Sequence, residues 1–218
     1  MLEKQSLEFL SNLARNNNRD YFISQKPHYE RYKQNYLELA GAFLSELELI
    51  DPKLGVLEPK DCTFRINRDI RFSADKTPYK TNMAIWVSPG HKKENFAGFY
   101  VHIEPGKSFL AAGLYWPDAS QLREVRNELA FFHEDLRQII ADWNGAYQID
   151  RAPEYALKTS PKGYDKEHPA LEFLQLKSFT VTHKLTDKEV LAPDFVKKTA
   201  EHFKKLAPFV AFLNRPLQ

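Results

Sequence analysis

The chain has 218 residues, of which 43% are hydrophobic, 13% aromatic and 28% charged. This balance is typical of a folded globular protein and excludes disorder, collagen and coiled coil as overall descriptions. The formal net charge is only +2, from 31 Lys and Arg against 29 Asp and Glu, so the overall charge does not favour a nucleic-acid or membrane partner. The longest apolar run, residues 110–116, is too short to cross a membrane.

The single cysteine and the first residues of the chain indicate the cellular compartment in which the protein is expected. Cys62 is the single cysteine, so the sequence predicts neither an internal disulfide nor a cysteine-based zinc site, and a reducing compartment fits best. The first residues lack a basic segment followed by an apolar one, so we expect no secretory signal. We therefore expect a cytoplasmic protein.

Apolar residues at helical spacing predict four helices over residues 3–15, 27–49, 118–143 and 193–213, and a shorter one follows Pro169 to residue 176. Pro27 suits a first helical turn, where its missing N–H costs nothing. Asp118 is a suitable N-cap for the central helix. Residues 144–168 lack periodicity and are expected to be mostly irregular.

Short β-rich segments lie between and after these helices. The pattern predicts five strands, over residues 63–68, 82–88, 98–104, 109–116 and 178–184. The turn signal Glu104-Pro105-Gly106-Lys107 joins two of them so tightly that they must pair antiparallel. We predict one α+β domain over residues 1–218, with an antiparallel sheet of about five strands flanked by N-terminal, central and C-terminal helices.

Residues 65–82 carry the densest charge pattern of the chain. Three arginines follow one another at a spacing of three, and a guanidinium offers a fixed fork of donors that suits carboxylate or phosphate. The two aspartates of the segment can orient those forks. The candidate ligand-binding residues are Arg65, Arg68, Asp69, Arg71, Asp75, Lys76, Tyr79 and Lys80.

The predicted strand over residues 98–104 has a polar face. Side chains alternate along a strand, so Tyr100, His102 and Glu104 point to one side, away from the core. His102 and Glu104 are candidates for proton transfer if this face lies beside the charged segment; an ordinary exposed strand face is the alternative. A third ligand for a metal is not identifiable, so we expect no metal site, and no motif indicates a cofactor.

The charged segment resembles the signature Arg-x-x-Arg-Asp-x-Arg-Phe-x-x-Asp-Lys-x-Pro-Tyr-Lys-x-Asn of the DUF2461 family, and every fixed position is present between residues 65 and 82. Residues 17–22 are similar to the family's N-terminal element, with Tyr21 where Trp is usual. Residues 99–106 resemble its central hairpin and residues 161–169 its C-terminal block. The resemblance implies membership of a mostly bacterial family of proteins of this size, and it implies no particular reaction.

Three functional interpretations follow from these residues. In the first, the charged segment forms a basic pocket for a small phosphate- or carboxylate-bearing ligand, in an enzyme or in a binding protein. In the second, the same residues contact nucleic-acid phosphates, and Phe72 or Tyr79 stacks on a base. In the third, the ion pairs only stabilise an interaction domain. We favour the first and expect no membrane partner; the sequence leaves cofactor and oligomeric state open.

Overall fold

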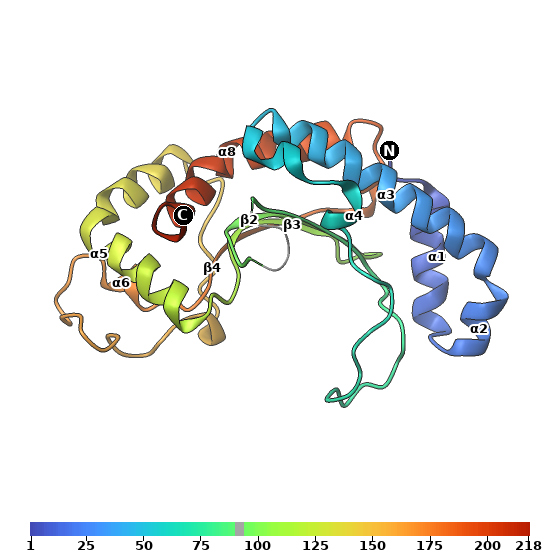
Figure 1. Cartoon of the computed structure of the whole chain (residues 1–218), viewed down its shortest axis with the longest axis horizontal. Coiled ribbons are helices and arrows are strands. Elements are labelled where there is room, and N and C mark those ends of the chain that lie inside the picture. The colour runs from blue at the N-terminus through green and yellow to red at the C-terminus, as the bar shows by residue number, and fades with distance from the viewer. Residues whose placement is uncertain (90–93) are drawn as a thin grey trace. The chain divides into compact units, whose positions relative to one another are not determined.

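We describe residues 1–89 and 94–218 in a computed structural model (Figure 1). The chain forms two compact units. Unit 1 contains Met1–Val87, Tyr100–Leu110 and Lys184–Glu201, and unit 2 contains Ser88–Phe99, Ala111–His183 and His202–Gln218. Each unit is therefore assembled from three separate stretches of sequence. The single domain expected over the whole chain stays a prediction.

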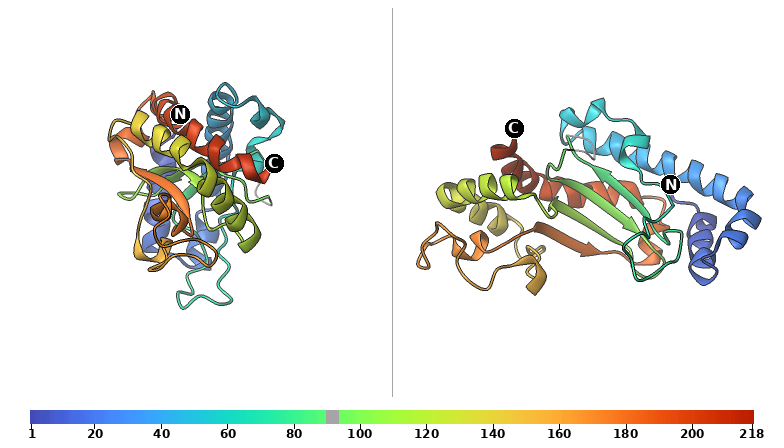
Figure 2. Two further views of the ribbon diagram at one scale, coloured as in Figure 1. Left: turned by 90° about the vertical axis from the view of Figure 1, so that its left-hand side faces the viewer. Right: turned by 60° about the horizontal axis from the view of Figure 1, so that its bottom comes forward.

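The predicted α+β class and antiparallel sheet are confirmed, with four strands instead of five. The strands are β1 (Met83–Val87), β2 (Gly98–Ile103), β3 (Phe109–Leu114) and β4 (Phe179–Lys184), in the order β1-β2-β3-β4 (Figure 2). The turn predicted between β2 and β3 is present: Lys107 N–H donates to the Glu104 carbonyl at 2.9 Å, and Gly106 has a positive φ of 72°.

The predicted strand over residues 63–68 is wrong. Asn67 forms one isolated antiparallel bridge, with Tyr79, and the segment pairs only with the chain that follows it. Two physical reasons explain this. Pro78 has no N–H to extend a ladder, and the charged side chains around it would have to be desolvated on both sides of a sheet.

Unit 1 contains the helices of the N-terminal half: α1 (Lys4–Arg15), α2 (Arg19–Ser24), α3 (Lys26–Glu48), the 3-10 turn Pro52–Val56 and α4 (Pro59–Cys62). The helix predicted over residues 27–49 from its apolar spacing is confirmed as α3, whose buried face includes Tyr32, Tyr36, Leu39, Phe43 and Leu47. Phe43 packs edge-on against Phe195 at the start of α8 (Phe195–Asn214), with ring centroids 5.5 Å apart.

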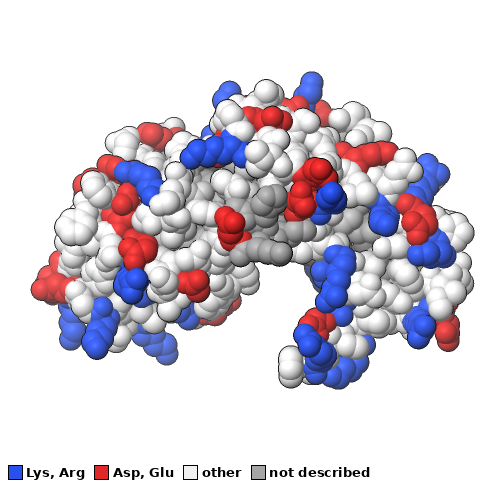
Figure 3. All heavy atoms as spheres, in the orientation of Figure 1, with Lys and Arg blue, Asp and Glu red and all other residues white. Residues whose placement is uncertain are grey.

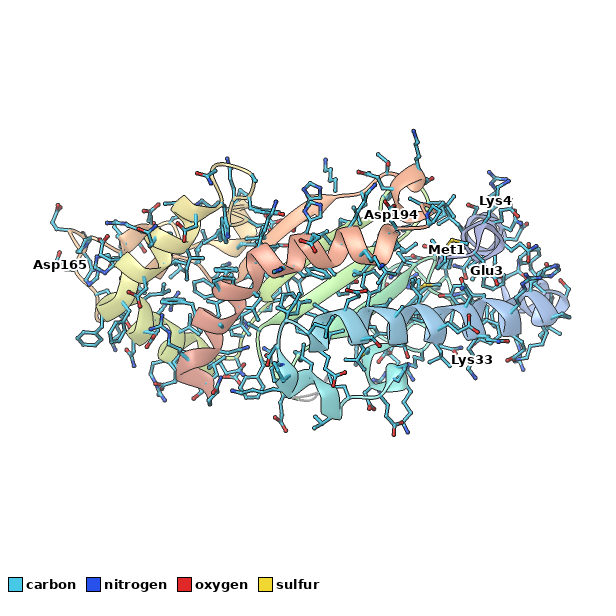
Figure 4. The ribbon with its side chains drawn as sticks, turned by 90° about the horizontal axis from the view of Figure 1, so that it is seen from above. Met1, Glu3, Lys4, Lys33, Asp165 and Asp194 are labelled. Carbon is cyan, nitrogen blue, oxygen red and sulfur yellow. The ribbon has the colours of Figure 1, made fainter. Side chains whose placement is uncertain are left out.

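A buried asparagine on α3 holds the beginning of the chain. Asn35 is 3% exposed; its amide nitrogen donates to the Met1 carbonyl at 2.9 Å, and its oxygen accepts from the Glu3 N–H at 2.9 Å. The same oxygen accepts from the Ser6 hydroxyl. Figure 4 shows Met1 and Glu3 at the end of α1 beside α3. This polar contact satisfies backbone groups that precede and begin α1.

The short helix predicted after Pro169 is confirmed as α6 (Leu171–Leu174), but the short helices α2 and α7 (Asp187–Val190) were not predicted. The sequence favoured a polar break at residues 16–20, but Asn18 accepts a hydrogen bond from Tyr21 N–H at 2.9 Å and so caps α2. In unit 1, Thr186 and Glu189 form a capping box around the four-residue α7 (Asp187–Val190). A helix this short forms too few backbone hydrogen bonds to offset the cost of starting it, and side-chain caps like these supply part of the missing stabilisation.

Unit 2 contains α5 (Ala119–Asp142) and α6 (Leu171–Leu174) with the C-terminal part of α8. Asp118 caps α5 as predicted, accepting from the N–H groups of Ser120 and Gln121 at 2.8 and 2.9 Å. Residues 144–168 are largely irregular, apart from the 3-10 turn Pro153–Tyr155 and isolated bridges. Among the described residues no helix is both long and apolar enough to span a membrane.

Candidate functional site

Residues 65–82 form an arm that extends from unit 1 as two adjacent lengths of chain (Figures 1 and 2). Its two sides are joined by backbone hydrogen bonds near the base. Lys80 N–H donates to the Ile66 carbonyl at 2.8 Å, and Arg68 N–H donates to the Pro78 carbonyl at 2.9 Å. Beyond these backbone hydrogen bonds, toward the tip of the arm, contacts of side chains hold the loop together.

Arg68 pins the two sides of the arm to each other. Its guanidinium donates to the Asp75 carboxylate, to the Thr77 hydroxyl and, at 3.1 Å, to the Thr77 carbonyl. The carboxylate also accepts from Thr77 N–H at 2.9 Å. This N–H bond and the guanidinium together lower the pKa of Asp75. The donors of Arg68 are therefore directed at groups within the arm.

The tip of the arm balances most of its own charge. Arg71 donates to both carboxylate oxygens of Asp69, at 2.9 and 2.7 Å, and the guanidinium lowers the pKa of that carboxyl group. Lys76 donates to the Ile70 carbonyl at 2.9 Å. Basic and acidic side chains accordingly lie together on the arm in Figure 3. Phe72 at the tip is 95% exposed.

The N-terminal element anchors the base of the arm. The side chain of Asn17 donates to the Tyr79 carbonyl at 2.8 Å and accepts from the Tyr79 N–H at 3.0 Å. The Tyr79 ring stacks on Phe22, with centroids 4.1 Å apart and planes 18° from parallel, and Phe22 in turn packs against Tyr29 of α3. Residues 17–22 therefore position the last part of the signature. Tyr79, a candidate ligand-binding residue from the sequence, is 7% exposed.

A groove of about 560 Å³ lies in unit 1 between α3, the base of the arm and β1. Aromatic and basic side chains dominate its walls. The lining residues are Tyr29, Tyr32, Lys33, Tyr36, Leu37, Lys60, Thr63, Phe64, Arg65, Ile66, Asn67, Lys80, Asn82 and Ala84. We call this site the α3 groove.

Tyr36 organises the floor of the α3 groove. Its hydroxyl donates to the Ala84 carbonyl of β1 and accepts from Phe64 N–H at 3.0 Å. Burial raises the pKa of Tyr36 to about 12, and the N–H groups of Phe64 and Ala84, which donate to the phenol oxygen, partly offset this rise. The phenol therefore stays neutral, and it fixes the chain that carries Phe64 and Arg65 against α3.

Four cationic side chains line the α3 groove, and no carboxylate is among its described lining residues. Lys60 pairs with Glu58 at 2.6 Å, and Lys80 lies 5.3 Å over the Phe64 ring. For Lys33 and Arg65, no carboxylate among residues 1–89 and 94–218 lies within ion-pair distance. Figure 4 shows Lys33 pointing outward from α3.

The polar face of β2 carries a hydrogen-bonded row. His102 Nε2 lies 3.2 Å from the Glu104 carboxylate, and His102 Nδ1 lies 3.1 Å from the Tyr100 hydroxyl. Neutral His102 can donate from Nε2 to Glu104 and accept at Nδ1 from Tyr100. The ring also stacks on Phe109, with centroids 4.7 Å apart. The alternation predicted for this strand is confirmed, because the intervening Val101 is only 2% exposed.

The end of the arm connects the two parts of the site. Asn82, which lines the α3 groove, places its amide nitrogen 3.5 Å from His102 Nδ1. The neighbouring Thr81 hydroxyl donates to Glu104 at 3.2 Å. The His102 imidazole, which can accept a proton, is thus separated from the cationic α3 groove only by the Asn82 side chain. This adjacency is the arrangement that the sequence suggested as a condition for proton transfer.

The signature residues divide between two places. Arg65 and Lys80 line the α3 groove, whereas Arg68, Asp69, Arg71, Asp75 and Lys76 engage one another or the backbone in the rest of the arm. Sequence reasoning missed Lys33 and Lys60 as lining residues. A signal for Lys33 was present, because it follows Tyr29 by one helical turn and so shares its face of α3.

No group of three or more His, Cys, Asp or Glu side chains suited to a metal ion occurs within residues 1–89 and 94–218. Cys62 is fully buried at the end of α4.

Neither a curated protein nor a solved structure matches the chain. The family model described as "Conserved hypothetical protein (DUF2461)" matches residues 5–212, which is nearly the whole chain, the arm and β2 included. The chain therefore belongs to the DUF2461 family.

Proposed function

We propose that the α3 groove binds a small anionic ligand bearing a phosphate or carboxylate group. The observation that carries the proposal is the presence of four basic side chains without a carboxylate among the described lining residues. The contrast between Arg65 and Arg71 supports it, because Arg71, at the tip of the arm, has a carboxylate partner within the same loop. A volume of about 560 Å³ suits a small molecule.

The roles of the basic residues follow from their chemistry. Arg65 offers a planar fork that binds two oxygens of one anion, and Lys33 and Lys80 add point charges in the same groove. The aromatic walls around Phe64 and Tyr29 would hold the uncharged part of the ligand. The preferred ligand is therefore a phosphorylated or carboxylated compound with an apolar or ring-containing portion.

Ligand-induced stabilisation tests this function. The purified protein is heated with inorganic phosphate, nucleoside monophosphates, sugar phosphates and dicarboxylates in separate samples. A ligand at 100 times its Kd adds about 2.7 kcal/mol, which raises the Tm of a chain of this size by roughly 5–10 °C. Arg65→Gln and Lys33→Gln each weaken that ligand roughly tenfold.

Lys4→Gln is the matched control. Lys4 carries the same charge as Lys33, its side chain is 79% exposed, and it pairs only with Glu8 among the described carboxylates, at 3.3 Å. In Figure 4, Lys4 and Lys33 point from opposite sides of unit 1. A ligand whose Kd changes equally in Lys4→Gln and Lys33→Gln, or a panel in which no anion raises the Tm, would refute the proposal.

The hydrogen-bonded row of Tyr100, His102 and Glu104 on β2 supports a catalytic function for the α3 groove. His102 would take a proton from a bound ligand or water while Glu104 stabilises the resulting imidazolium, since the two groups are already 3.2 Å apart. His102→Gln separates this function from binding: the Kd for the anion stays within a few-fold of the wild-type value, while turnover of that ligand is lost.

The nucleic-acid interpretation remains a second candidate because of one observation. Phe72 is 95% exposed, and the Arg71 guanidinium lies 5.8 Å from its ring, an arrangement that could stack on a base beside a phosphate. Binding of a short single-stranded oligonucleotide that falls steeply with salt and is lost in Phe72→Ala would support this function. Binding without salt dependence would remove it.

A further inference from the structure

Three aromatic side chains of unit 2 form a cluster outside the α3 groove. The ring centroids of Tyr115 and Trp116 are 6.3 Å apart, those of Tyr115 and Tyr155 are 6.3 Å apart, and those of Trp116 and Tyr155 are 5.9 Å apart. The three ring planes are nearly perpendicular to one another, at 84°, 84° and 76°. Tyr115 is 56% exposed and Trp116 is 43% exposed.

The cluster is assembled on a short segment that precedes β4. Lys177 N–H donates to the Tyr155 carbonyl at 2.7 Å, which places Tyr155 beside this segment. Trp116 N–H donates to the hydroxyl of the neighbouring Ser178 at 3.2 Å, and Ser178 is fully buried. Residues far apart in the sequence are therefore brought together by hydrogen bonds of the Trp116 and Tyr155 backbone, which makes the positions of the rings reproducible.

The backbone of Trp116 is held in an unfavourable conformation. Its φ is +46°, a region that bulky side chains rarely adopt. Hydrogen bonds on both sides maintain it, from Trp116 N–H to Ser178 and from the Asn95 amide to the Trp116 carbonyl at 3.3 Å. Strain that the surroundings maintain in this way, at an exposed tryptophan, is typical of binding sites.

The cluster already has one cation over an aromatic face and two carboxylates near one of its rings. The Lys177 ammonium already lies 5.2 Å from the centroid of the Trp116 ring, which is a cation–π distance. Burial raises the pKa of the Tyr155 phenol, and Tyr115, Glu154 and Asp150 raise it further, so the two carboxylates contribute negative potential at this ring.

We propose that Tyr115, Trp116 and Tyr155 form an aromatic cage for a quaternary ammonium group and that Lys177 competes with the ligand for the Trp116 face. Perpendicular rings at these separations can turn their faces toward one point within roughly 6 Å of each centroid, which suits a rounded cation. A flat ligand ring would instead need parallel faces. A trimethylammonium group forms no hydrogen bonds with water, so it is desolvated more easily than the ammonium of Lys177.

Calorimetric titration of the full-length protein with choline tests the cage. The comparison ligand is the uncharged analogue in which a tert-butyl group replaces trimethylammonium, because it has the same shape without the charge. We expect choline to bind and the analogue to bind at least tenfold more weakly. Tyr155→Leu weakens choline roughly five- to tenfold. Phe131→Leu, which removes a ring that is 81% exposed on α5, leaves the Kd unchanged.

Lys177→Gln provides a second test that does not depend on removing a ring. The substitution keeps the backbone N–H that binds Tyr155 but removes the competing cation, so choline binds more tightly than to the wild-type protein. Equal affinity for choline and its uncharged analogue, no binding of either, or weaker choline binding in Lys177→Gln would overturn the proposal. These results leave the anion site in unit 1 unaffected, since that site is tested by other ligands and variants.

Discussion

Replacing Arg68 by glutamine distinguishes an arginine that maintains the arm from one that binds ligand. The Arg68 side chain is 26% exposed, and its guanidinium donates to the Thr77 carbonyl at 3.1 Å as well as to the Asp75 carboxylate. The hydrogen bond to Thr77 contributes about 1 kcal/mol at such a partly exposed position. The ion pair adds little, because the partner carboxylate is largely exposed.

A loss of about 1 kcal/mol corresponds to roughly fivefold more frequent opening of the arm. The Lys80 amide reports this opening, because its N–H donates across the arm to the Ile66 carbonyl at 2.8 Å. Native-state hydrogen exchange should therefore be roughly fivefold faster at this amide in Arg68→Gln, whereas amides in the core of α3 keep their rates.

Arg71→Gln is the control for this measurement. Arg71 has the same charge, but its side chain is 75% exposed and it pairs with a carboxylate two residues away, so its removal leaves the two sides of the arm joined. Equal exchange at Lys80 in Arg68→Gln and the wild-type protein would refute the pinning role. Equal acceleration in Arg68→Gln and Arg71→Gln would show that net charge, and not the cross-arm hydrogen bonds, determines opening.

Two further predictions address pH and packing. The folded structure lowers the pKa of Asp75 below its ordinary value of 3.8. The ionised carboxylate therefore stabilises the arm at pH values above 3.8, and this stabilisation is lost as the pH falls through the lower pKa of the folded state. NMR titration of the Asp75 carboxyl group should show this lowered pKa, and Arg68→Gln should raise it. A Cβ on Gly113 would lie 2.0 Å from the Phe179 carbonyl at a φ of +128°, so Gly113→Ala should destabilise the fold by about 3 kcal/mol or more in urea denaturation. Stability within 0.5 kcal/mol of wild type, as is common at surface positions, would contradict that contact.

Local sequence signals were enough to predict the long elements. The apolar period of α3, the cap at Asp118 and the turn that ends at Lys107 all depend on residues within a few positions of each other. They therefore appear in the sequence much as they appear in the structure. The one-turn helix α7 and the false strand at residues 63–68 differ, because a side-chain cap decides the helix and a partner strand decides the strand, and neither is visible in a short window.

For the charged segment, residues 65–82, some properties could be predicted from the sequence and others depend on the tertiary structure. Its residues identified the family and the ionic character of the segment, and the alternation along residues 98–104 identified the face of β2 that carries His102. Tertiary structure alone decided that Arg65 lines a groove with Lys33 while Arg68, three residues later, binds within the arm. The physical reason is that a guanidinium binds whichever acceptor is close in space, and hairpin register and the packing of α3 set those distances.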